Sequence, residues 1–150
     1  MPADRLRARV AELLDMVGLD DRQARSLPKA LSGGQRRRVA IARALAAEPR
    51  ILILDEVIAA LDVSIQAQLL ALLTRIRTET GTALLFITHG LGAVRHIGDD
   101  VLVMRSGRVV ERGPVAPVLG DPQDPYTRRL VASLPKPGRK PRRRADEAAA

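Results

Sequence analysis

Residues 31–62 read LSGGQRRRVAIARALAAEPRILILDEVIAALD, and this stretch combines four features that predict an α/β fold. Ser32 before two glycines favours the start of a helix, because a serine side chain can cap the first turn. We expect that helix to run from Gln35 to about Ala47. The residues ILIL then form a short unbroken apolar run, which is typical of a strand buried on both faces. An acidic pair follows the strand directly, so a polar strand end is predicted there.

The composition is that of one globular domain. The 150 residues are enough for a single core. The absence of cysteine excludes disulfides and thiolate metal sites. The N-terminal residues are charged and lack the apolar core of a signal peptide, and no apolar run approaches the ~20 residues that span a bilayer. We therefore expect a cytoplasmic protein that reaches a membrane only through a partner.

The net charge is +8, and half of it lies in residues 134–150, which hold six basic and two acidic side chains. Such a basic tail can bind nucleic acid or anionic lipid. It can equally be a solvated, disordered tail, and no aromatic residue for base stacking accompanies it. We favour the solvated tail and expect no direct nucleic-acid partner, with nucleic-acid binding kept as an alternative.

Further helices and strands are predicted on both sides of the opening stretch. Apolar residues recur at helical spacing in four segments: 4–17, 63–78, 91–97 and 126–133. Asp62 can cap the second of these helices and Gly81 can end it. ALLFIT predicts a second buried strand, while VLVM and VVE around RSGR predict a hairpin. Strands that alternate with helices indicate a parallel sheet, in which ligands gather at the carboxyl ends of the strands.

The residues at the expected strand ends carry the candidate chemistry. Asp55 is placed to hold Mg²⁺ on nucleotide phosphates, and Glu56 can orient or deprotonate an attacking water. His89 follows the second strand and can hydrogen-bond a γ-phosphate. Gly33 and Gly34 let a phosphate approach the N–H groups of the next helix. The basic residues on that helix are predicted to form a solvated face.

The order of these parts resembles the ATP-binding cassette (ABC) transporter ATPases. LSGGQ matches the family's signature motif, ILILDE its Walker B strand, ALD its D-loop, and His89 its switch histidine. The resemblance covers about Arg5 to Pro135. LDVSIQAQLLALL and DPQDPYTRRLVASLP further resemble the ATP-binding subunits of oligopeptide and dipeptide importers, a pattern that nickel and some glutathione importers share.

The resemblance implies a dimer of cassettes with ATP between them, bound to transmembrane permease subunits. Four residues would then complete the partner cassette's ATP site, namely Ser32, Gly33, Gly34 and Gln35, with Asp62 in the D-loop between the sites. Asp55 would hold Mg²⁺, and Glu56 and His89 would be catalytic, at the ATP on this chain's own Walker A loop. The 150 residues contain no G-x-x-x-x-G-K-[ST] loop.

Without that loop we expect a partial P-loop NTPase-like cassette that does not hydrolyse ATP alone, either a fragment of a normal subunit or a non-hydrolytic interaction module. An aliphatic face and a strand edge would then be open. Val57, Ala59 and Gly90 replace the family's usual Pro, Ser and Asp, which frees the backbone after Glu56, removes a hydroxyl from the D-loop and loosens the backbone after His89.

Four parts are predicted along the chain. They are a helical-subdomain portion with the signature motif at 1–47, an α/β core at 48–113, an oligopeptide-importer-type segment at 114–135, and a basic disordered tail at 136–150.

Overall fold

The computed structural model describes residues 2–134, and the chain divides into two units between Gly98 and Asp99. This division falls inside the predicted core range 48–113. The predicted tail at 136–150 lies outside the described residues. No helix among residues 2–134 is both long and apolar enough to cross a membrane.

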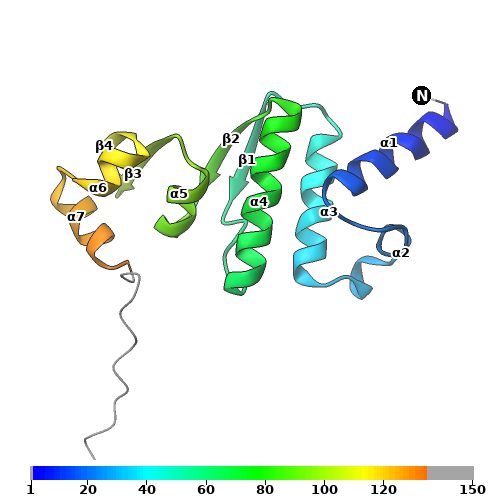
Figure 1. Ribbon diagram of the computed structural model, residues 1–150, viewed down its shortest axis with the longest axis horizontal. Coiled ribbons are helices and arrows are strands. Elements are labelled where there is room, and N and C mark those ends of the chain that lie inside the picture. Colours follow the sequence, from blue (N-terminus) through cyan, green and yellow to red (C-terminus); the bar gives the residue numbers. More distant parts are fainter. Residues whose placement is uncertain (1, 135–150) are drawn as a thin grey trace, which may run out of the picture. The chain divides into compact units, whose positions relative to one another are not determined.

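The first unit contains helices and one small parallel sheet (Figure 1). Its elements are α1 (Ala3–Met16), α2 (Asp21–Ala24), the 3-10 helix η1 (Pro28–Ala30), α3 (Gly33–Leu45), β1 (Ile51–Asp55), α4 (Val63–Thr80), β2 (Ala83–Ile87) and α5 (Leu91–Ile97). The predicted helices and both predicted strands are confirmed. α2 was not predicted, although Asp20 and Gln23 form a capping box at its start.

Strands β1 and β2 pair directly and in parallel, with Leu52 opposite Leu84 and Asp55 opposite Ile87. α4 connects them and lies alongside the pair (Figure 1). A left-handed Gly81, at φ 68°, ends α4 as predicted. The βαβ unit brings the carboxyl ends of both strands to one edge.

One face of the sheet and one stripe of each long helix form the core. Leu52 and Leu54 point inward from β1, and Leu73 and Ile76 of α4 are completely buried. The other core members come mainly from α1, α3, α4 and α5: Leu13, Val17, Leu19, Ile41, Ala42, Leu45, Ile58, Leu69, Leu70, Leu72, Ala93 and Ile97. This shared core fixes the signature helix α3 and the sheet in one unit.

The other face of the sheet is open, so the prediction of strands buried on both faces is wrong for the described chain. Ile51 and Ile53 are 61% and 63% exposed, and Leu85 and Ile87 of β2 lie next to them at 47% and 45%. The burial of β1 alternates residue by residue as a one-sided strand requires. The expectation of an open aliphatic face is thereby confirmed.

The second unit is a β-hairpin with two short helices: β3 (Asp100–Arg105), β4 (Arg108–Pro114), α6 (Val115–Gly120) and α7 (Pro125–Ala132). Ser106 and Gly107 form the two-residue turn, both with positive φ, as a tight hairpin turn requires. The hairpin and α7 are confirmed. α6 was not predicted; its Pro117 lies in the first helical turn, where the missing N–H costs nothing.

Candidate functional site

The signature turn at the start of α3 is closed by its own side chains. The Ser32 hydroxyl accepts a hydrogen bond from the backbone N–H of Gln35 at 3.2 Å, and the Gln35 side-chain oxygen accepts one from the N–H of Ser32 at 2.8 Å. This capping box confirms Ser32 as the N-cap. It also fixes the direction in which the first helical N–H groups point.

Gly33 and Gly34 differ in how closely the rest of the chain approaches them. A Cβ atom on Gly33 would meet nothing within 4 Å in the described structure, and one on Gly34 would lie 3.5 Å from a methyl group of Ile65. Packing among the described residues therefore does not require glycine at position 33. A requirement for glycine there would have to come from a ligand or partner that approaches from outside.

Glu56 and His89 meet at the carboxyl edge of the sheet. The His89 Nδ1 atom lies 3.1 Å from Glu56 Oε1, in a hydrogen bond, and 3.1 Å from Oε2. The Glu56 backbone N–H donates to the carbonyl of Ile87 at 3.0 Å, which extends the parallel pairing one residue beyond β1. The side chains are 44% and 81% exposed, although the Oε2 atom of Glu56 is itself buried and has no hydrogen-bond partner among the described residues. The sequence correctly predicts that these residues converge.

Asp55 ends β1 at the same edge, with an exposed side chain. Mg²⁺ on a nucleotide is commonly held by one or two protein carboxylates together with phosphate oxygens. Asp55 fits that requirement as a single carboxylate. Among residues 2–134, no group of three or more acidic, histidine or cysteine side chains could hold a metal by itself. A metal here would therefore depend on oxygens from its substrate.

The segment from Glu56 to Asp62 links this edge to α4 through an unusual backbone. Glu56 and Ala60 both have positive φ, at 49° and 56°, a conformation that costs a non-glycine residue roughly 1–2 kcal/mol. Asp62 occupies the N-cap position of α4, but its side chain makes no capping hydrogen bond. Its carboxylate is exposed and remains available for another contact.

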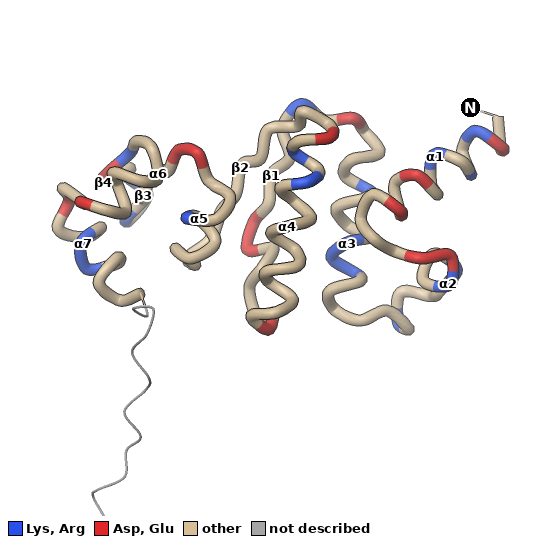
Figure 2. The backbone as a smooth tube through the Cα atoms, viewed as in Figure 1, with Lys and Arg blue, Asp and Glu red and all other residues tan. Residues whose placement is uncertain are grey.

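Two arginines of α3, Arg37 and Arg38, are half-buried and contradict the prediction of a solvated basic face, whereas Arg36 and Arg43 are exposed. Figure 2 shows positive charge along α3. Arg36 donates to the carbonyl of Leu31 at 2.9 Å, Arg37 to that of Ala59 at 2.7 Å, and Arg38 to that of Val17 at 2.9 Å. Arginine can stay charged while it satisfies buried carbonyls, because its stem packs on apolar surface. Nothing in the helical spacing alone distinguishes these arginines from a solvated row.

Gln66 is another residue near the site whose contacts the sequence did not predict. Its side-chain amide donates to the carbonyls of Ile58 at 3.3 Å and Leu61 at 3.0 Å. It therefore contacts the Glu56–Asp62 segment from α4, while Arg37 contacts it from α3.

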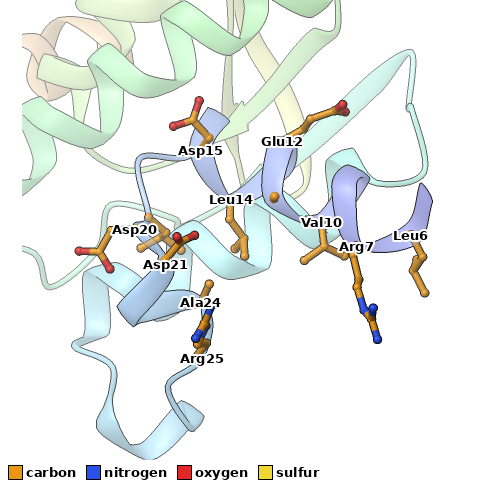
Figure 3. Close-up of a pocket in the computed structure, with 12 residues that line it drawn as sticks. Leu6, Arg7, Val10, Glu12, Leu14, Asp15, Asp20, Asp21, Ala24 and Arg25 are labelled. Atoms are coloured by element: carbon orange, nitrogen blue, oxygen red, sulfur yellow. The ribbon is translucent and has the colours of Figure 1, made fainter. Parts of the chain in front are cut away.

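A hollow among the described residues lies elsewhere, between α1 and α2 (Figure 3). It has a volume of about 740 Å³ and is lined by Leu6, Arg7, Val10, Ala11, Glu12, Leu14, Asp15, Leu19, Asp20, Asp21, Ala24 and Arg25. None of the predicted site residues borders it. The chemistry of the candidate site therefore does not come from this hollow.

In the second unit, Glu111 fastens the segment that precedes α7. Its carboxylate accepts hydrogen bonds from the backbone N–H groups of Gln123 at 2.8 Å and Asp124 at 3.1 Å. The Thr127 hydroxyl, those two N–H groups and the Arg128 charge hold the pKa of Glu111 below its ordinary value. The hydroxyl faces the carboxylate outside good hydrogen-bond geometry, so the backbone contacts are the well-formed ones.

Strand β1 with its acidic end, a parallel neighbour ending in histidine, and the capped Ser-Gly-Gly helix together define part of an ABC-type nucleotide-binding cassette. Solved structures support this class. The dimeric bacterial ABC transporter cassette MJ0796 matches with TM-score 0.67 and 35% identity, over 77% of this chain and 49% of that one. The cbiO1 protein of Clostridium perfringens, part of the ABC transporter complex cbiONQ, matches with TM-score 0.75 and 34% identity, over 89% and 52%.

Sequence relatives indicate which kind of ABC cassette the chain resembles. The family described as ABC transporter matches residues 3–59. The oligopeptide transport ATP-binding protein OppD of Mycobacterium bovis is 50% identical over 87% of this chain and 21% of its own length. OppF of Lactococcus lactis is 45% identical over 85% and 40%, and the glutathione import ATP-binding protein GsiA of Pectobacterium atrosepticum 50% over 85% and 20%.

Over most of its length the chain is similar to the ATP-binding proteins of ABC transporters, including those named for oligopeptide transport. It spans between a fifth and two fifths of the length of these relatives.

Proposed function

We propose that this chain is part of the ATP-binding component of a peptide-import ABC transporter, where it couples ATP binding and hydrolysis to transport. The oligopeptide-type relatives support a peptide cargo. The similarity to a glutathione import protein leaves other small peptides as alternative cargo. Nickel and related cargo remain a further alternative. Permease subunits would hold it at the cytoplasmic face of the membrane.

The observation that carries the proposal is the contact between Glu56 and His89 at the carboxyl edge of the sheet. A carboxylate there can orient or deprotonate a water. An imidazolium at His89 can donate its Nδ1–H to Glu56 and its Nε2–H to a phosphate oxygen, because both ring nitrogens of a protonated histidine are donors. Asp55 would hold Mg²⁺, which screens phosphate charge when it is bound.

The signature turn would serve a different nucleotide. Ser32, Gly33, Gly34 and Gln35 lie at the N-terminus of a long helix, where N–H groups and the helix dipole favour an anion. We propose that they contact ATP held by a second cassette, and that Asp62 lies between the two sites. The solved MJ0796 cassette is dimeric, and another of its structures contains ADP and Pi, which supports this arrangement.

The test is an ATPase assay on the chain mixed with an N-terminal cassette half that carries G-x-x-x-x-G-K-[ST], taken from an oligopeptide-type relative. Glu56→Gln is expected to lower kcat by about 10²–10⁴-fold, the range for loss of general-base catalysis. Glu79→Gln, a change to an exposed glutamate on α4, is the matched control and is expected to leave the rate unchanged. Equal rates for the two variants would contradict the assignment of Glu56.

The open face of the sheet favours a second candidate, an interaction module without hydrolysis of its own. Ile51, Ile53, Leu85 and Ile87 form a contiguous apolar surface, and such a surface on a strand pair fits burial by another segment. A complementing half that binds the chain tightly but gives no ATP turnover would favour this reading. Turnover on mixing would favour the transporter ATPase.

A further inference from the structure

The backbone between Glu56 and Leu61 contains two strained residues. Few hydrogen bonds within the segment itself stabilise this conformation. Two internal bonds join Ala59 N–H to the Glu56 carbonyl at 3.0 Å and Leu61 N–H to the Ile58 carbonyl at 3.4 Å. The positive φ angles of Glu56 and Ala60 are sparsely populated by such residues and persist only where surrounding contacts enforce them. Those contacts come from two helices.

Arg37 of α3 supplies the contact from one side. Its Nη2 atom donates to the Ala59 carbonyl at 2.7 Å, a short, charge-assisted hydrogen bond. The neighbouring Nη1 atom is buried at the same place and has no hydrogen-bond partner among residues 2–134. Burial of a guanidinium with one nitrogen unsatisfied is costly. Arg37 is buried beside the strained loop in spite of this cost, which indicates that it does more than stabilise the fold.

Gln66 of α4 supplies the contact from the other side. Its amide nitrogen donates to the carbonyl of Ile58, two residues before Ala60, and to that of Leu61, the residue after it. Arg37 and Gln66 together satisfy three carbonyls in four consecutive residues. The loop is therefore bracketed from both helices, and Glu56 forms its first residue.

We propose that Arg37 and Gln66 are positioning residues that hold the Glu56–Leu61 loop so that the Glu56 carboxylate meets His89. The inference rests on the proposed role of Glu56. Because Arg37 is on the same helix as the Ser32 cap, it also ties the signature turn to the loop of this chain's own site. A shift of α3 on contact with a partner's phosphate would thereby reach Glu56.

The first test measures the loop in the 150-residue chain by amide hydrogen exchange. Arg37→Met and Gln66→Leu are expected to speed exchange of the Ala59 and Leu61 amides at least about tenfold, as local opening becomes easier. The matched controls are Arg43→Met and Gln68→Leu, on exposed side chains of the same helices. Arg37→Lys keeps one donor and the charge, so it should rescue protection in part, and it decides the test if Arg37→Met does not fold.

The second readout is the tautomer of His89, followed by ¹⁵N NMR at alkaline pH with His96, the other of the two histidines, as internal reference. Loss of Arg37 is expected to reduce the share of His89 that carries its proton on Nδ1, because Glu56 no longer accepts it. A purely structural role for Arg37 would leave the tautomer unchanged. Unchanged exchange together with an unchanged tautomer overturns the inference.

The third readout separates this inference from the proposed function. In the mixture with the Walker A half, Arg37→Met and Gln66→Leu are expected to lower kcat about 10- to 100-fold, the cost of a misplaced catalytic group, with KM for ATP nearly constant. A mixture of unmodified halves that does not hydrolyse ATP contradicts the proposed function, while exchange and the tautomer still decide the positioning role. A rise in KM with constant kcat contradicts positioning.

Discussion

Helices α3 and α4 each begin after a polar N-cap residue, Ser32 or Asp62, but their N-termini are stabilised in different ways. At α3, Ser32 and Gln35 close a capping box within four residues. At α4, Asp62 makes no capping bond, and the preceding loop is held by Arg37, 22 residues before Ala59, together with Gln66. The signature turn is thus specified locally, whereas the loop that carries Glu56 depends on the rest of the fold.

The largest effect on stability is expected for Ser32→Ala. It removes a capping hydrogen bond and should lower the free energy of unfolding by about 1 kcal/mol, within the range of about 0.5–2 for such caps. Asp62→Ala is the matched change at a cap without a side-chain bond and should cost clearly less. Urea unfolding followed by circular dichroism measures both. An equal cost for the two would show that the N-termini do not differ as described.

A smaller effect is expected for Ala60→Gly. Glycine adopts the observed φ of 56° without a Cβ penalty, but it gains entropy in the unfolded chain, so the two terms offset each other within about 1 kcal/mol. Ala67→Gly, in the exposed middle of α4, should instead destabilise by about 1 kcal/mol. If Ala60→Gly cost as much as Ala67→Gly in the same urea experiment, residue 60 would not be strained in solution.

The smallest expected effect is a dependence of the stability of the second unit on pH. The pKa of Glu111 is lowered from its ordinary value of 4.5, so the folded unit prefers the ionised carboxylate. This contribution is fully present above pH 4.5 and is lost as the pH falls through the lowered pKa. Tyr126, the single tyrosine in a chain without tryptophan, stacks against Arg105 at 5.1 Å and reports on α7 by fluorescence.

We expect the fluorescence of Tyr126 to change on acidification below pH 4.5 and the change to shrink in Glu111→Gln. Glu12→Gln, on an exposed residue of the first unit, is the control and should titrate like the unmodified chain. An identical titration of Glu111→Gln would contradict the role of Glu111.

The parts of the fold that were predictable are those set by short-range pattern. Helical spacing, the Ser32 cap and the apolar runs before Asp55 and His89 were enough to predict the helices other than α2, η1 and α6, the parallel sheet, and the convergence of Glu56 with His89. Contacts between distant residues were not predictable. The bond from Arg37 to Ala59 looks like any arginine on a helix surface, and the run ILIL cannot indicate which face of its strand is covered.

We propose that Glu56 of this chain serves an ATP site whose phosphate-binding loop is not among these 150 residues. The most direct measurement is the rate of ATP hydrolysis by the purified chain, alone and after the Walker A half is added, each with and without Glu56→Gln. We expect no Glu56-dependent turnover by the chain alone and Glu56-dependent turnover in the mixture. Turnover by the chain alone that Glu56→Gln abolishes would contradict this proposal.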